Sequence, residues 1–324
     1  MTPKNEVRVV LLLEKIVDLL EEMAARRSGP ALTEAPDTSP AAAPETPSSQ
    51  PAGEAILACL QGLGVQVKAT GTANSLDRAL ADTACFIGDH YAAVQDLLSR
   101  IKSALPYHGS LHVDLKGRPP EVVQANLHLA GELHRIAFLE SYQYLKAPRS
   151  LIQARPSGLP AAQRFFTGHW FEIYCREKIL AWLRGAGLED RAQLLHNVQV
   201  KLPDGEDFEF DLLLWLDGRL FWFEQKSGSY QHNLEKYARL ADRLVLDRNH
   251  AFLVLAQAGE KTAQVLGDLC GMTVCTTDTL ERELDRAFTA SGRATAEERA
   301  GPVADSVEFE LIEVDDQSFP LAPV

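Results

Sequence analysis

The C-terminal half of the sequence predicts an α/β fold in which a mixed central sheet is flanked by helices. After Arg155 the apolar side chains follow a helical period, then a strand-like period, and then alternate between the two. Asp217 and Gly218 form a two-residue turn signal between two strand-like runs. The expected elements are a helix over 171–184, strands over 198–202, 208–216 and 220–225, a helix over 233–246, a strand over 251–256, a helix over 261–269, a strand over 272–276 and a helix over 280–288.

The ends of these elements have local reasons. The first helix stops at Gly185 and Gly187, because glycine readily adopts the left-handed backbone that closes helices. The runs that follow are short and rich in Val, Phe, Leu and Trp, which is typical of strands. Residues 156–290 are therefore expected to form one domain with this order of elements.

The N-terminal half predicts a different organisation. Residues 1–27 contain an amphipathic helix, because a broad apolar stripe runs through residues 6–27 among Glu, Lys and Arg. Residues 28–53 are almost entirely Ala, Pro, Ser, Thr, Glu and Gly, which is typical of a disordered linker. Residues 54–155 are expected to be a mainly helical domain of unknown role. Its helices are expected over 55–63, 75–83, 90–105 and 120–145, with short strands at 65–69 and 111–115.

The N-terminal helix carries a seam that favours self-association. Five apolar residues follow the alternating four-three spacing of a coiled coil: Val9, Leu13, Ile16, Leu20 and Met23. The helix must pack on a second copy, on a partner or on its own chain. We expect a homodimer through this helix, with folding back onto the body as the alternative.

Charge and composition limit the classes of function. The chain has 324 residues, 46% of them hydrophobic, and a formal net charge of −13. This balance argues against loose electrostatic binding to a phosphate backbone. The charge is uneven, however, because no Lys or Arg follows Arg299 and residues 291–324 form an acidic tail. The acidic residues after Arg299 are Asp305, Glu308, Glu310, Glu313, Asp315 and Asp316.

Two further features bear on location. The sequence has no run of eighteen uncharged apolar residues and no secretory signal, so we expect a cytoplasmic protein without a membrane span. The five cysteines are odd in number and widely spaced, which favours buried free thiols over disulfides or a metal knuckle.

Three charged residues interrupt or end apolar strand runs. Asp211 lies six positions before the hairpin turn and Glu224 six positions after it, so the two should pair across the hairpin. Glu224 and Lys226 are two apart in one strand and therefore share a face. Two carboxylates and one ammonium thereby meet at one spot.

This grouping suits phosphodiester hydrolysis. Two carboxylates can hold a hard cation such as Mg²⁺ or Mn²⁺ and leave positions open for a phosphate oxygen and water. Lys226 would orient the attacking water or help to deprotonate it. A cross-strand salt bridge at a strand end is the alternative interpretation of the same three residues.

The residues also resemble a known superfamily. The segments 168–172, 209–211 and 223–228 are similar to the nuclease domain of CRISPR-associated ancillary nucleases that cyclic oligoadenylate activates, within the PD-(D/E)xK superfamily. The resemblance covers roughly residues 164–288. It implies a restriction-endonuclease-like fold, a nucleic acid substrate and a role in prokaryotic defence.

The resemblance also implies a role for individual residues. Asp211 and Glu224 would be metal ligands, with the backbone carbonyl of Gln225 as a third. Lys226 would be the catalytic lysine, and Glu172 an accessory acid on the preceding helix. Relatives often carry Cys at the position of Gln225, which removes no required side chain.

One departure concerns activation. The similar nucleases carry a doubly wound nucleotide-sensing domain, whereas residues 54–148 do not show alternating strands and helices. Activation by a small molecule or a protein partner is therefore left open. The alternative function is a non-catalytic interaction protein that retains a nuclease-like fold, which the acidic balance favours and the intact Asp211, Glu224 and Lys226 set opposes.

Other polar residues have ordinary alternatives. Tyr230, His232 and Lys236 could contact a phosphate backbone, although a solvated helix start explains them better. Five histidines precede residue 156, and ordinary surface or packed positions explain them better than metal binding does. They are His90, His108, His112, His128 and His134.

Overall fold

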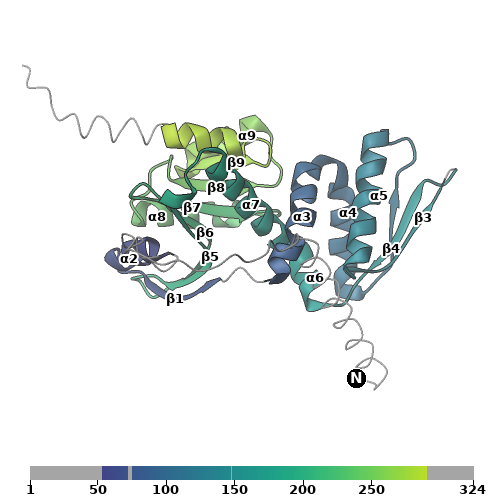
Figure 1. Ribbon diagram of the computed structural model, residues 1–324, viewed down its shortest axis with the longest axis horizontal. Helices are drawn as coiled ribbons and strands as arrows, with labels where there is room; N and C mark the ends of the chain where they lie inside the picture. The colour runs from purple at the N-terminus through teal and green to yellow at the C-terminus, as the bar shows by residue number, and fades with distance from the viewer. Residues whose placement is uncertain (1–52, 72–74, 147, 290–324) are drawn as a thin grey trace, which may run out of the picture.

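A computed structural model describes residues 53–71, 75–146 and 148–289 (Figure 1). The predicted N-terminal helix, all of the predicted linker but its last residue, and the predicted acidic tail lie outside the described residues. Among the described residues, no helix is both long enough and apolar enough to cross a membrane. The five cysteines are free thiols, of which Cys175, Cys270 and Cys275 are buried.

A mixed six-stranded sheet forms the larger body, in the order β1-β5-β6-β7-β8-β9. Strands β1, β5, β6 and β7 pair in antiparallel fashion, whereas β7, β8 and β9 are parallel. The mixed α/β class expected from the sequence is therefore confirmed. The strands are β1 (Gln66–Gly71), β5 (Ala192–Lys201), β6 (Asp207–Leu216), β7 (Arg219–Lys226), β8 (Ala251–Leu255) and β9 (Thr273–Thr276).

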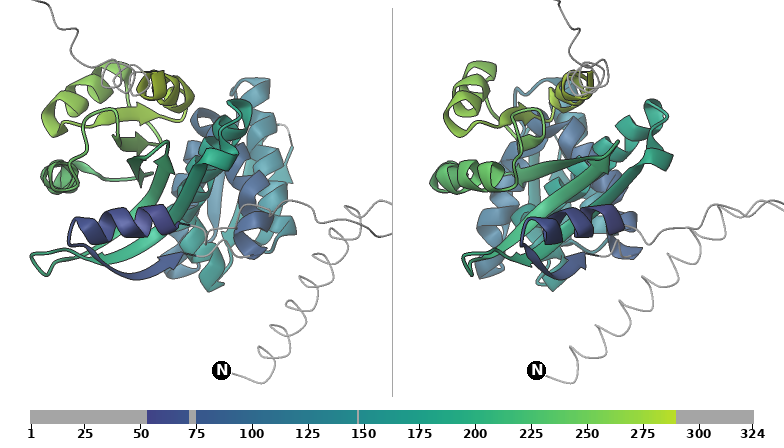
Figure 2. Two further views of the ribbon diagram at one scale, coloured as in Figure 1. Left: turned by 60° about the vertical axis from the view of Figure 1, so that its left-hand side comes forward. Right: turned by 90° about the vertical axis from the view of Figure 1, so that its left-hand side faces the viewer.

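Helices cover both faces of this sheet (Figures 1 and 2). On one face, α2 (Glu54–Gly62), α8 (Leu234–Arg243) and α9 (Glu260–Cys270) enclose a core that includes Trp222 and Leu253. On the other face, α7 (Trp170–Gly185) and a helix over residues 280–289 pack on side chains such as Phe223 and Phe252. Strand β8 is buried along its whole length, as its apolar sequence predicts.

The hairpin between β6 and β7 has the predicted turn. Asp217 and Gly218 both have positive φ values, 52° and 82°, which is the backbone of a type I′ turn. The resulting register pairs Leu212 with Phe223. Asp211 and Glu224 are the next residues outward from that pair, as the count from the turn predicts.

A smaller body precedes α7 in the chain. It contains α3 (Ser75–Asp89), α4 (Tyr91–Ala104), α5 (Pro120–Arg135) and a three-stranded antiparallel sheet in the order β2-β4-β3. Its core continues through α7 into the larger body. Its strands are β2 (Leu111–Asp114), β3 (Leu139–Leu145) and β4 (Leu151–Pro156).

Two secondary-structure predictions for this half were wrong. The helix expected over 120–145 ends at Arg135, because Ala137 takes a positive φ of 61° and the chain turns back as β3. Strand β4 was not predicted at all. Strand β1 matches the expected strand at 65–69, but it pairs with β5 in the large sheet, whereas the sequence assigned it to the helical domain.

Candidate active site

Lys226 joins the two predicted carboxylates. Its Nζ lies 2.7 Å from Glu224 Oε1 and 3.1 Å from Asp211 Oδ2. The backbone N–H of Gln225 donates a 2.8 Å hydrogen bond to the same Asp211 oxygen. The structure therefore brings the three residues together at the point where β6 and β7 diverge beyond their last paired residues.

The two carboxylates are removed from solvent. The side chain of Glu224 is 4% exposed and that of Asp211 is 13% exposed. Burial, together with the charge of Asp211, raises the pKa of Glu224 to about 7 against the lowering effect of Lys226. Burial also raises the pKa of Asp211, although Lys226 and the Gln225 N–H oppose it. Burial lowers the pKa of Lys226, but both carboxylates outweigh this effect and the net pKa is raised.

One oxygen of this group is not fully hydrogen-bonded. Within the described part of the chain, Glu224 Oε2 is buried and makes no hydrogen bond of ordinary geometry, although the nearby Tyr237 hydroxyl lowers the pKa of Glu224. A buried carboxylate oxygen of this kind costs free energy unless a donor or a cation satisfies it. Asp211 and Glu224 therefore fit a hard divalent cation. Among the described residues, no group of three His, Cys, Asp or Glu side chains is arranged to hold a metal, so a third ligand would have to be a backbone oxygen or water.

The raised pKa of Glu224 predicts how the stability of the metal-free protein depends on pH. The folded state holds the Glu224 proton up to about pH 7, whereas an ordinary Glu releases it near 4.5. The folded protein therefore loses stability as pH rises through this window. We expect Glu224→Gln to melt above the wild type at pH 8 in EDTA and at the same temperature at pH 5. A lower melting temperature for Glu224→Gln at pH 8 would instead indicate a stabilising salt bridge.

Glu172 lies at the start of α7 in a polar network. Its Oε2 accepts a 2.8 Å hydrogen bond from His169 Nδ1 and a 3.3 Å bond from Asn197 Nδ2. Burial raises its pKa, but the contact with His169, the Asn197 hydrogen bond and the charge of Arg164 together outweigh burial, so the net pKa is lowered. The charge of Glu172 in turn raises the pKa of Asp211, so the predicted accessory acid is electrostatically coupled to the centre.

His169 links this network to the smaller body. Its Nε2 lies 2.9 Å from Oδ1 of Asp77, a residue in the first turn of α3. Asp77 Oδ2 also lies 3.8 Å from Nη1 of Arg176 on α7. Both ring nitrogens of His169 face carboxylate oxygens, which favours the doubly protonated ring. Burial lowers the pKa of His169, yet these hydrogen bonds raise it on balance.

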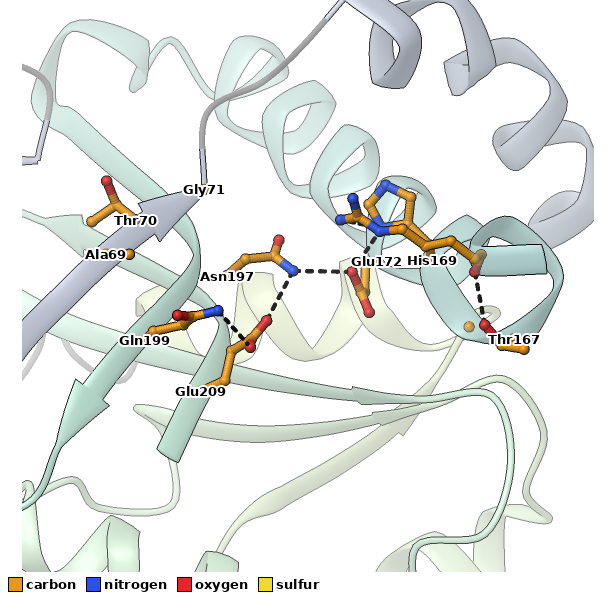
Figure 3. A pocket seen from close by; sticks show the side chains of 11 residues that line it. Ala69, Thr70, Gly71, Thr167, His169, Glu172, Asn197, Gln199 and Glu209 are labelled. Atoms are coloured by element: carbon orange, nitrogen blue, oxygen red, sulfur yellow. Dashed lines mark hydrogen bonds and ion pairs between the residues drawn. The ribbon is translucent and has the colours of Figure 1, made fainter. Parts of the chain in front are cut away.

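A cleft of about 470 Å³ opens beside Glu172 (Figure 3). It is lined by the end of β1, the π-helical turn Phe165–His169, the start of α7 and the facing parts of β5 and β6. A chain of hydrogen bonds crosses it from Glu172 through Asn197 to Glu209, and Gln199 also donates to Glu209. The register of β5 and β6 places Asn197 between the partners of Leu212 and Phe210, opposite Asp211.

The sequence did not identify this network. The His169–Glu172 pair has the three-residue spacing that places side chains together on a helix, which was the available signal. Asp77 lies 92 positions away from His169, and the local sequence around it gives no sign of the contact. Asn197 has a positive φ of 49°, which Asn tolerates better than most residues, but this is visible only in the structure.

The other polar residues considered from the sequence occupy ordinary places. Lys236 Nζ lies 2.7 Å from Glu206 Oε1 and 5.0 Å from the ring centre of Phe208, so it faces the β5–β6 connection. His90 stacks on Phe86 at 4.2 Å between ring centres. His134 Nδ1 lies 3.0 Å from the backbone oxygen of Leu139.

Comparison with known proteins gives only distant likenesses. No family model matches the chain, and no curated protein matches it. The chain is similar to the crystal structure of protein VC1899 from Vibrio cholerae, with a TM-score of 0.49, 18% identity and coverage of 74% of this chain and 61% of that one. It is also similar to Can2 from Sulfobacillus thermosulfidooxidans in complex with cyclic tetra-adenylate, with a TM-score of 0.47, 14% identity and coverage of 70% and 59%. The chain thus spans about three fifths of each protein, and we base no functional inference on these likenesses.

Proposed function

We propose that the chain is a metal-dependent nuclease that hydrolyses phosphodiester bonds of DNA or RNA, with Asp211, Glu224 and Lys226 as its centre. The observation that carries this proposal is the buried carboxylate pair, in which Glu224 Oε2 makes no hydrogen bond of ordinary geometry among the described residues. Ionising both acids destabilises the fold when Lys226 is their only cationic partner among the described residues and no metal ion is bound, as the raised pKa values of both acids indicate. Ionisable groups whose pKa values are shifted in this way cluster at functional sites.

Each residue has a role that follows from its surroundings. Asp211 and Glu224 would hold Mg²⁺ or Mn²⁺, with the backbone carbonyl of Gln225 proposed as a third ligand. The bound cation would stabilise the negative charge that develops on the phosphate. The raised pKa of Lys226 keeps its ammonium charged at neutral pH, so Lys226 would donate hydrogen bonds to water and phosphate oxygens rather than remove a proton.

A direct assay tests this proposal. Full-length protein is incubated with labelled single-stranded and double-stranded DNA and RNA in Mg²⁺, in Mn²⁺ and in EDTA. We expect cleavage of at least one substrate with either metal and none in EDTA. Absence of cleavage under every condition would favour the non-catalytic interaction protein, which the formal net charge of −13 also favours. A role in prokaryotic defence and a nucleotide or protein activator are part of the proposal only through the family resemblance.

Glu172 is proposed to support the metal centre from outside it. We expect Glu172→Gln to raise the metal concentration for half-maximal cleavage about tenfold, because outer residues that tune metal ligands typically contribute this much. The matched control is Glu260→Gln, since the Glu260 side chain is 81% exposed at the start of α9. If both variants needed the same metal concentration for half-maximal cleavage, the proposed role of Glu172 at the site would be wrong.

A further inference from the structure

The cleft beside Glu172 adjoins the proposed centre on two sides. Glu172 forms one wall, and its charge reaches Asp211. Gly168 forms another wall and faces the hydroxyl of Ser227, the residue after Lys226. The volume of about 470 Å³ lies within the range of sites that bind small organic groups. A substrate whose phosphate lies at the centre would therefore place a neighbouring group in this cleft.

The lining is less suited to a second phosphate than to a neutral group. Two carboxylates, Glu172 and Glu209, face the cleft, and of its two cationic side chains His169 is already bound to Glu172 and Asp77, which leaves Arg164. A phosphate would be repelled by both acids. The hydrogen-bonding chemistry instead suits a neutral group that presents N–H donors, and the nucleobase is the part of a nucleic acid that has them.

Glu209 has unused capacity for such donors. Its carboxylate accepts two long hydrogen bonds, 3.2 Å from Asn197 Nδ2 and 3.4 Å from Gln199 Nε2. A carboxylate offers about four acceptor positions. Glu209 and Gln199 are exposed on neighbouring strands, and Figure 3 shows both side chains at the cleft.

We propose that this cleft holds an unpaired nucleobase next to the scissile phosphate, and that Glu209 selects bases that carry an exocyclic amino group. The proposal rests on the proposed nuclease function. Cytosine would donate its N4 amino hydrogens to Glu209. Uracil and thymine present a carbonyl oxygen at the same position, and this oxygen is repelled by the carboxylate. The base must be unpaired, because a base inside a duplex cannot enter a cleft of this kind.

Oligonucleotide binding tests the proposal without turnover. Fluorescein-labelled 12-mers of cytidine and uridine, and of deoxycytidine and thymidine, are titrated with full-length protein in EDTA and followed by anisotropy. Gels verify that the oligomers stay intact. We expect the cytosine oligomers to bind about tenfold more tightly, the lower end of what one well-placed base contact contributes. Comparing the ribose with the deoxyribose oligomers shows whether the bound base comes from RNA or DNA. Annealed duplexes should bind without a preference for cytosine.

Two variants identify the residue responsible. Glu209→Gln presents both a donor and an acceptor, so we expect its cytosine preference to fall below about twofold. Glu260→Gln removes the same charge at the start of α9, outside the lining of the cleft, and should keep the preference. Equal binding by the wild type, a preference that survives Glu209→Gln, or no binding of any oligomer would each overturn the proposal. Cleavage is measured separately. A cytosine preference in a protein that cleaves no substrate would contradict the proposed nuclease function but support base binding in the cleft.

Discussion

Asp211→Asn, Glu224→Gln and Lys226→Ala are each expected to slow cleavage at least about a hundredfold while the fold stays intact. The two acid substitutions remove a charge that would hold the cation, whose stabilisation of the transition state is worth several kcal/mol. Lys226→Ala removes the ammonium that lies within 3.1 Å of both carboxylates. Initial rates at saturating Mg²⁺ and matched protein concentration measure the effect, and circular dichroism verifies folding.

Lys236→Ala is the matched control for the loss of a lysine. Lys236 lies on α8 and its ammonium is bound to Glu206, so its removal should change the rate less than about threefold. A rate close to wild type in any of the three centre variants would withdraw that residue from the mechanism. Loss of activity with loss of folding would also contradict the expectation, because the acid substitutions remove a buried charge and conserve side-chain volume.

The candidate centre could be predicted because it depends on local rules. A two-residue turn fixes the register of its hairpin, so counting outward from Asp217 and Gly218 was enough to bring Asp211 and Glu224 together. Strand alternation then placed Lys226 beside Glu224. Strand β8 could also be predicted, because five consecutive apolar residues next to turn signals indicate a buried strand.

The rest depends on partners that are distant in sequence. Strand β1 is an edge strand whose residues are mostly exposed, so it carries little apolar pattern, and its partner β5 lies more than 100 residues later. Strand β3 follows α5 after a short turn, and buried and exposed residues alternate only weakly along it. The sequence therefore predicted that the helix continues through this strand. The secondary structure of such segments is decided by their pairing with distant strands and not by their own sequence.

The second large effect is expected at Asp77. Asp77→Ala should lower the free energy of unfolding by about 3 kcal/mol, because it leaves the buried His169 Nε2 without its acceptor and removes one of the two carboxylates beside the buried Arg176. Asp77→Asn keeps an oxygen that can accept from His169 and should lose only about 1 kcal/mol. Urea unfolding at pH 6 measures both. Asp82→Ala, at an exposed position on the same helix, should stay within about 0.5 kcal/mol of wild type.

The pH dependence of this effect follows from His169. Its pKa in the folded protein is raised above the ordinary 6.5, so the folded state holds the ring proton more tightly than the unfolded chain. The resulting stability is fully present below about pH 6.5 and is lost as pH rises through the raised value. The gap in unfolding free energy between wild type and His169→Gln should therefore be largest near pH 6 and shrink toward pH 9. The titration of Glu224 is common to both proteins and cancels in the difference. A gap that widened with pH would mean that His169 is neutral in the fold, and the two carboxylate contacts would then need another explanation.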